Sequence, residues 1–109
     1  MKESVMAGLA SGIKKAKVRF YSSIRAAAGT SGQEVELPVG CTVYTLLKLL
    51  SDDYGDAFRN ELFKQTVGGL RDDLIISING VISGHESAIS EIISDCAVID
   101  LLTTFPGGG

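Results

Sequence analysis

The residues best suited to chemistry stand at the end of the chain, which reads Phe105-Pro106-Gly107-Gly108-Gly109. Without a Cβ, a run of glycines can pass through a channel too narrow for any other residue. Pro106 stiffens the start of this run because its ring fixes φ. The last glycine offers a free α-carboxylate, which is a poor electrophile until a partner activates it, most simply as an acyl-adenylate made from ATP. The activated carbonyl can then accept a sulfur nucleophile or a lysine amine. A passive, flexible end is the alternative interpretation of the same glycines.

Few other side chains offer a reactive set. His85 is the only histidine, and Cys41 and Cys96 lie far apart with no CxxC pair. A tetrahedral zinc site would need carboxylates to complete it, so we expect no metal. We expect both cysteines to be buried free thiols and His85 to lie in an exposed loop. A self-contained enzyme using a Ser–His–Asp or Cys–His pair stays an alternative, although no nucleophile-elbow motif is present.

The composition indicates one small folded domain. The chain has 109 residues, of which 45% are hydrophobic, and a formal net charge of −3. No apolar run approaches the roughly 20 residues of a membrane-spanning helix. The acidic balance argues against nucleic acid as the main partner, because phosphate binding needs a basic surface. The absence of paired cysteines favours a reducing compartment, so we expect a cytoplasmic protein with neither nucleic acid nor membrane as a partner.

The first 16 residues differ from the rest and are predicted to form an N-terminal extension. Residues 1–17 carry a net charge of +3, whereas residues 18–109 carry −6. Val5, Leu9 and Ile13 recur at helical spacing, which is compatible with a short amphipathic anchor helix or with a frayed end. Residues 17–109 are then the domain.

The domain shows alternating strand patterns and one strong helical pattern. Strands are predicted over 17–21, 33–37, 74–78, 81–82 and 97–104, with a turn at Asn79-Gly80 and a glycine-containing turn over 26–32. Val43, Leu46, Leu47 and Leu50 share one helical face, which predicts a helix over 42–53 with Thr42 as its N-cap. A second short helix is expected near 57–63 and a loop over 66–69.

This order of elements fits an α+β roll of the ubiquitin, or β-grasp, kind. It predicts a mixed sheet of four to five strands with one main helix across it. The first and last strands would lie side by side and parallel in the middle of the sheet. Folds of this type carry many functions, so the fold alone does not define an activity.

Several short motifs resemble a known family in their order and spacing. The segment from Phe20 to Gly29 resembles the F-A-x-x-R-E-x-A-G opening of MoaD-type sulfur carriers, with Arg25 at the family's arginine. Gly40-Cys41-Thr42-Val43 is similar to G-x-T-V, and the turn at Ile78-Asn79-Gly80 follows in order. The end, from Ile99 to Gly108, is closer to the Urm-type ubiquitin-related modifiers. The resemblance to the MoaD/ThiS/Urm family, which includes the archaeal SAMP modifiers, covers residues 17–109.

The resemblance implies a carrier or modifier and not an enzyme. A MoeB-type, ubiquitin-activating-like enzyme would use ATP and magnesium to adenylate Gly109 or Gly108, and a sulfurtransferase would convert it to a thiocarboxylate. Gly107, Pro106, Phe105 and Arg25 would contact partners. The sulfur would pass to molybdopterin with a MoaE-type large subunit, of whose synthase this chain would be the small subunit, or to tRNA thiolation. Alternatively, the tail would be conjugated to lysines of target proteins.

Three departures leave the branch of the family open. This chain ends in three glycines where members usually have two, and it lacks the second proline and the following residues of the MoaD tail F-P-P-V-x-G-G. Arg25 is followed by Ala26, not by Glu. A non-reactive β-grasp module that binds only through its sheet stays an alternative of another class.

Overall fold

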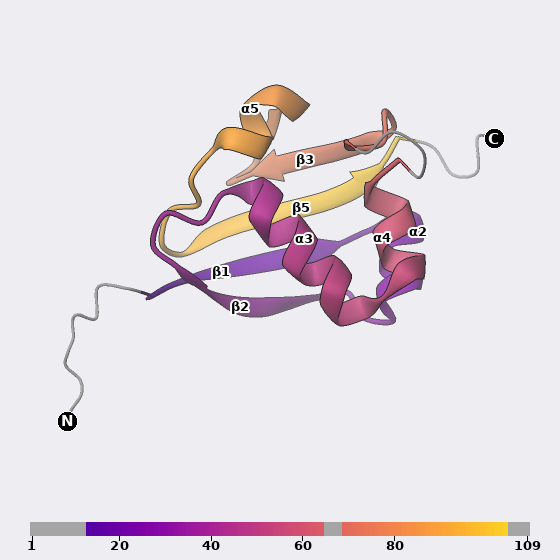
Figure 1. The fold of residues 1–109 in the computed structure, drawn as a ribbon, viewed down its shortest axis with the longest axis horizontal. Helices are drawn as coiled ribbons and strands as arrows, with labels where there is room; N and C mark the ends of the chain where they lie inside the picture. Colours follow the sequence, from indigo (N-terminus) through magenta and orange to yellow (C-terminus); the bar gives the residue numbers. More distant parts are fainter. Residues whose placement is uncertain (1–12, 65–68, 105–109) are drawn as a thin grey trace.

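The computed structural model describes residues 13–64 and 69–104. Within these ranges, five strands form one mixed sheet in the order β2-β1-β5-β3-β4 (Figure 1). The strands are β1 (Ile13–Phe20), β2 (Gly32–Pro38), β3 (Leu74–Ile78), β4 (Val81–Ser83) and β5 (Ala97–Thr103). The helices are α2 (Ser22–Ala28), α3 (Val43–Tyr54), α4 (Asp56–Leu62) and α5 (His85–Ser90). The predicted α+β roll of the β-grasp kind is confirmed.

The first and last strands are parallel neighbours at the centre of the sheet, as the sequence predicts. β1 pairs with β5 over a register that ends at Phe20 opposite Leu101. β1 is antiparallel to β2, and β5 is antiparallel to β3. The buried residues of β5 alternate along the strand, so one of its faces packs into the core: Ala97, Ile99, Leu101 and Thr103.

β1 begins earlier than the sequence predicts. Its ladder with β2 starts at Ile13, which lies opposite Pro38. Residues 13–16 therefore belong to the sheet, although the sequence places them in the N-terminal extension. Ile13 therefore does not belong to the amphipathic helix that its spacing from Val5 and Leu9 suggests. Its pairing with β2 determines its conformation more strongly than the local spacing of apolar residues. The rest of the predicted extension lies outside the described residues.

A short helix, α2, connects β1 to β2 where the sequence predicts a turn. Its alanines favour helix, and Ile24 anchors it by being fully buried. The helix ends at Gly29, which has a left-handed φ of 77° and donates its N–H to the Arg25 carbonyl at 2.9 Å. The two strands are antiparallel neighbours, and the connection between them is a short helix where the sequence predicts only a turn.

The main helix, α3, agrees closely with its predicted bounds and face. The Thr42 side chain accepts a hydrogen bond of 3.2 Å from the backbone N–H of Thr45, which caps the first turn. The predicted apolar face is buried: Val43, Leu46, Leu47 and Leu50. Gly55, at a φ of 96°, separates α3 from α4, the expected second short helix. The loop predicted over 66–69 lies outside the described residues except for its last residue.

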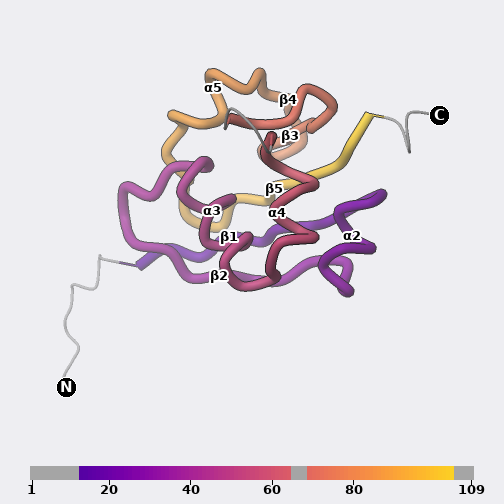
Figure 2. The backbone as a smooth tube through the Cα atoms, turned by 45° about the vertical axis from the view of Figure 1, so that its right-hand side comes forward, coloured from indigo at the N-terminus to yellow at the C-terminus, as the bar shows by residue number. Residues whose placement is uncertain are grey.

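The turn between β3 and β4 forms at Asn79-Gly80 as predicted. Both residues have positive φ, 53° and 86°, which is the geometry of a type I′ turn. The Asn79 Oδ1 accepts a hydrogen bond of 2.9 Å from the Val98 N–H, so the turn is also fastened to β5. β4 then lies at the edge of the sheet beside β3, and α5 follows it (Figure 2).

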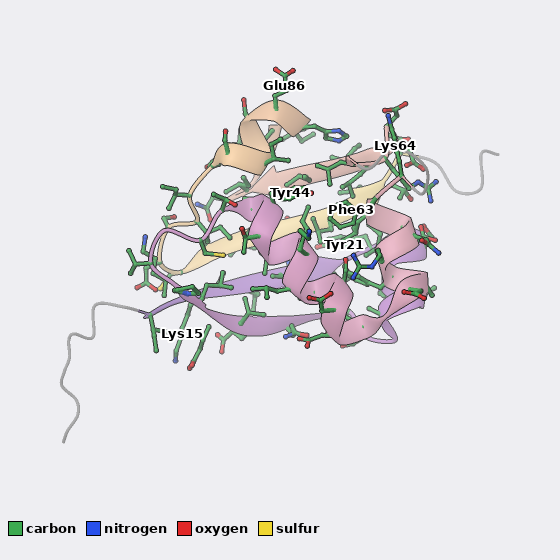
Figure 3. The ribbon with its side chains drawn as sticks, viewed as in Figure 1. Lys15, Tyr21, Tyr44, Phe63, Lys64 and Glu86 are labelled. Carbon is green, nitrogen blue, oxygen red and sulfur yellow. The ribbon has the colours of Figure 1, made fainter. Side chains whose placement is uncertain are left out.

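The core lies between the sheet and the helices, with an aromatic cluster at one end. The Phe20 ring packs edge-on against Tyr54 and Phe58, at centroid distances of 5.6 Å and 5.3 Å. A second edge-on pair joins Tyr44 of α3 to Phe63 after α4, at 5.9 Å (Figure 3). α3 and α4 cross one face of the sheet (Figure 1).

Candidate functional site

The C-terminal ends of β5 and β1 lie at the same end of the sheet. Because the two strands are parallel neighbours, their carboxyl ends meet there. The Tyr21 N–H donates to the Leu101 carbonyl at 3.0 Å, which fixes the two ends to each other. The Thr104 N–H donates to the Asp73 carbonyl at 2.9 Å. The chain is therefore held by backbone hydrogen bonds up to Thr104, the last described residue. The predicted acyl-carrier segment, Phe105 to Gly109, lies outside the described residues.

A polar network surrounds this end of β5. The Arg71 guanidinium donates two hydrogen bonds to the Asp73 carboxylate, at 3.1 Å and 3.0 Å, and a third to the Asn60 carbonyl at 3.0 Å. The Ser23 hydroxyl donates to the Glu61 carboxylate at 2.6 Å and lies 3.4 Å from the Thr103 hydroxyl.

The network closes through Arg71 and Glu61, whose charged groups lie 4.0 Å apart. It therefore links α2, α4 and the segment before β3 to the last residues of β5. We refer to the side chains of Ser23, Glu61, Arg71, Asp73 and Thr103 as the exit network. Sequence reasoning missed all of them as site residues, because the sequence separation between Ser23, Glu61 and Thr103 leaves no local pattern to recognise.

Arg25, the predicted partner-binding residue, lies at the same end of the sheet. It stands in the last turn of α2, where the sequence predicts no helix. The side chain is exposed and lines an open hollow of about 430 Å³ together with residues of α2 and the loop after it: Ser22, Ala26, Gly29, Thr30 and Ser31. The fold thus brings Arg25 to the edge from which the tail continues, and Figure 2 shows α2 and the end of β5 there.

The sheet face opposite the helices divides into a charged half and an apolar half. On the charged half, the Arg19 guanidinium donates two hydrogen bonds to Asp100, its register partner on β5, at 2.6 Å and 3.1 Å. The hydrogen bond to Asp100, and next its negative charge, raise the pKa of Arg19 above its ordinary value. On the apolar half, Ile75 lies opposite Leu102, and Ile82 lies on the same face opposite Ser77, two residues along β3 from Ile75; Ile82 is 71% exposed. We call these three residues the open-face patch.

The cysteines and the histidine differ in part from their predicted environments. Cys41 is buried, and burial raises the pKa of its thiol, whereas Cys96 is exposed, so the prediction that both are buried is wrong. Cys96 lies in the turn before β5 with a φ of 64° and donates its N–H to the Lys15 carbonyl, which leaves its side chain outside the core. His85 begins α5, and its Nε2 lies 2.6 Å from the Leu74 carbonyl oxygen. The prediction of an exposed loop for His85 is therefore wrong.

The described residues contain neither a cluster arranged to hold a metal ion nor a membrane-spanning helix. Over 13–64 and 69–104, no group of three His, Cys, Asp or Glu side chains is arranged to hold a metal ion. Within the same ranges, no helix has the length and apolar character needed to cross a membrane.

Solved structures with the same fold include archaeal and eukaryotic proteins. SAMP1 from Methanosarcina acetivorans is 26% identical, with a TM-score of 0.70 over 89% of this chain and 97% of that chain. The H. volcanii small archaeal modifier protein 1 is 17% identical, with a TM-score of 0.72 over 84% and 99%. Urm1 from Trypanosoma brucei is 18% identical, with a TM-score of 0.70 over 88% and 97%. No protein-family model matches the sequence, and no curated protein matches it.

The sheet order, the main helix and these similarities define a ubiquitin-like protein of the β-grasp class. The two structures below 25% identity show the fold alone. Together with the M. acetivorans structure and the motifs of residues 17–109, the comparisons support the MoaD/ThiS/Urm/SAMP family for this chain, the family that its sequence resembles.

Proposed function

We propose that this chain is a ubiquitin-like sulfur carrier whose terminal glycine, Gly109 or Gly108, is activated by a partner enzyme. A MoeB-type enzyme would join the glycine carboxylate to AMP and release pyrophosphate from ATP. The terminal sulfur of a sulfurtransferase persulfide would then attack the acyl carbon, AMP would leave, and an acyl disulfide would form. A second thiol of the partner enzymes would cleave that S–S bond, which forms a new disulfide on the partner and releases the thiocarboxylate. ATP and magnesium belong to the partner in this scheme. The chain is a co-substrate that contributes only the acyl carbon.

One observation carries the proposal. At the C-terminal end of β5, the backbone of the last described residue, Thr104, is hydrogen-bonded to the backbone of Asp73. The hydrogen bond from Thr104 to the Asp73 carbonyl sets the starting point of the following residues. The exit network surrounds that point, and Arg25 stands at the same edge. A glycine-rich segment beginning at a fixed point can enter a partner's active site while the body docks outside. Fixing the starting point also lowers the conformational entropy that is lost on entry.

The open-face patch is the docking surface that we propose for the activating enzyme. Ile75 and Leu102 are half-buried and Ile82 is exposed, and they share their sheet face with the paired charges of Arg19 and Asp100. An exposed apolar cluster with a polar rim is typical of a protein–protein contact. The paired charges of Arg19 and Asp100 lie at its border, where they would orient the partner.

Three branches of the family differ in the acceptor of the acyl group or of its sulfur. A MoaD-like carrier would pass sulfur to molybdopterin inside a MoaE-type large subunit, and a Urm-like carrier would pass it to tRNA. A modifier would instead form an amide with a lysine of a target protein. The similarity to SAMP1 of M. acetivorans, named a small archaeal modifier protein, favours the modifier as the second candidate.

Intact-mass spectrometry tests the proposal. The chain is incubated with a MoeB-type enzyme, ATP, magnesium, a sulfurtransferase and its sulfur donor. We expect the mass to rise by the difference between one sulfur and one oxygen atom. Deleting Gly109 alone would show which glycine reacts. High-mass conjugates that disappear when Gly108 and Gly109 are deleted would identify a modifier, whereas an unchanged mass with a competent enzyme would favour the non-reactive interaction module.

A further inference from the structure

The hollow beside Arg25 has the chemistry of a site for a negatively charged group. Besides Arg25, its lining residues include three with hydroxyl groups, Ser22, Thr30 and Ser31, and none with an acidic side chain. The Thr30 hydroxyl donates to the Gly32 carbonyl at 3.3 Å. The Arg25 guanidinium and the hydroxyls of Ser22 and Ser31 are left as donors. A guanidinium can donate two parallel hydrogen bonds to one carboxylate, so these groups suit a carboxylate ligand.

Arg25 differs from the neighbouring cations because the described residues supply it with no carboxylate. Three other cations near this end of the sheet each have a carboxylate oxygen within 4.0 Å: Arg19, Lys64 and Arg71. Arg25 forms no ion pair with any residue of 13–64 or 69–104. Its positive charge is therefore available to an anion that the described side chains do not provide.

The carboxylate at the end of the same chain is within reach of this hollow. The hydroxyl oxygens of Thr103 and Ser23 lie 3.4 Å apart, so the end of β5 adjoins α2 (Figure 2). Arg25 stands two residues further along α2, which is about 3 Å along the helix axis, and a helix is roughly 10 Å across. The five residues that follow Thr104 in the sequence can span up to roughly 17 Å. This length is enough to bring the terminal carboxylate to the guanidinium.

Attachment to the same chain favours this carboxylate over a free anion. A group on a short flexible linker has an effective concentration in about the millimolar range at a site that the linker can reach. The three final residues, Gly107, Gly108 and Gly109, place few steric limits on the direction in which the tail turns. The terminal carboxylate is therefore the anion that the hollow meets most often.

We propose that the hollow beside Arg25 binds the terminal carboxylate of its own chain. The guanidinium would donate two hydrogen bonds to the carboxylate, and the hydroxyls of Ser22 and Ser31 would donate to its remaining lone pairs. The proposal rests on the proposed function in one respect, which is that the chain carries a free carboxylate at Gly109 or Gly108. It adds a binding site for the tail before activation, and an activating enzyme must draw the carboxylate out of this site to adenylate it.

NMR spectroscopy tests this contact by comparing the full chain with a chain ligated to carry a terminal carboxamide, which has no negative charge. We expect the amide signals of Ser22, Arg25 and residues 29–31 to differ between the two proteins. In Arg25→Gln, amidation should move only signals of the tail. The pKa of the terminal carboxyl should be lower in the full chain than in Arg25→Gln by about half a pH unit, because a nearby positive charge favours the ionised form. Amidation that moves only tail signals in both proteins, or equal pKa values, would overturn the proposal.

Two further measurements identify the occupant of the hollow. Arg59→Gln is the matched control, because Arg59 is exposed and pairs with Asp52, and it should leave the pKa of the terminal carboxyl unchanged. Inorganic phosphate, titrated at pH 7, should bind beside Arg25 about threefold more tightly to the amidated chain than to the full chain, whose own carboxylate competes. Equal phosphate binding by the two chains would mean that the hollow takes external anions and not the tail, which would overturn the proposal. No activating enzyme is present, so a negative result here leaves the sulfur-carrier function standing, and a failed activation leaves this contact standing.

Discussion

The backbone N–H of Thr104 donates a hydrogen bond of 2.9 Å to the carbonyl oxygen of Asp73. These two residues stand at the end of β5 and immediately before β3, so the bond continues the antiparallel pairing of these strands. The Asp73 side chain is at the same time held by two hydrogen bonds from Arg71. Thr104, which precedes the glycine tail, is therefore held by a hydrogen bond to Asp73, and Asp73 is itself held by Arg71.

Replacing Arg71 should weaken the hydrogen bond between Thr104 and Asp73 without unfolding the protein. Arg71→Met removes the hydrogen bonds to Asp73 and the contact with Glu61, but retains a long apolar stem. The pairs are partly exposed, so we expect the free energy of unfolding to fall by less than about 1 kcal/mol. Amide hydrogen exchange at Thr104 should become clearly faster. Arg59→Met is the matched control, because Arg59 is about equally exposed and pairs with Asp52 at a distance from the tail. Equal exchange at Thr104 in both variants would show that the exit network does not hold this residue.

The buried face of α3 predicts a large loss of stability on truncation. Leu47 is fully buried, whereas its neighbour Leu49 is 45% exposed. Leu47→Ala should lower the free energy of unfolding by about 2–5 kcal/mol because it leaves a cavity in the core. Leu49→Ala, measured by the same denaturant titration, should cost far less. A loss below about 1 kcal/mol for Leu47→Ala would contradict the packing described for this helix.

Gly32 at the start of β2 should tolerate no side chain. A Cβ there would overlap the Val18 carbonyl oxygen on β1, and φ is 156°. Because the obstacle is backbone, Gly32→Ala must shift the ladder, and we expect a cost of about 1–3 kcal/mol. Gly84→Ala is the control, since a Cβ at Gly84 meets no atom within 4 Å. Thermal unfolding of the two variants should differ clearly, and equal melting temperatures would contradict the close approach of β1 and β2.

Cys41 should make stability depend on pH in the alkaline range. Burial raises the pKa of its thiol, so the folded protein retains the proton to higher pH than the unfolded chain does. This contribution is fully present below the unfolded pKa, about 8.5, and is lost as pH rises through the folded pKa. The free energy of unfolding should therefore fall above about pH 8.5, and it should fall less steeply in Cys41→Ala. Identical slopes for both proteins would exclude Cys41 as the cause.

Much of the fold follows from local patterns in the sequence. The leucine spacing of α3, the Asn79-Gly80 turn and the alternation of β5 each depend on residues close in the chain, so the sequence predicts them well. The sequence does not predict α2, because seven residues containing Ser22 and Ser23 give no clear period. It does not predict the early start of β1 either, because Ile13 is placed by its pairing with Pro38, which lies on another strand.

The candidate site is predictable only in part. The glycine tail and Arg25 stay predictions from continuous motifs, and the tail lies outside the described residues. The exit network cannot, because Ser23 and Glu61 meet only when α2 packs beside α4. The exposure of Cys96 likewise depends on its positive φ in the turn before β5, and no sequence pattern indicates that geometry.

Mass spectrometry of the C-terminal peptide tests the central claim most directly. The full chain and its Gly108→Ala variant are each incubated with a MoeB-type enzyme, ATP, magnesium and a sulfur-loaded sulfurtransferase, then digested. We expect one sulfur to replace one oxygen at the terminal glycine of the full chain, and no replacement in the variant, whose melting temperature should be unchanged. Sulfur bound instead at Cys96, or an unmodified terminus with an enzyme that activates another β-grasp carrier in the same reaction, would contradict the account.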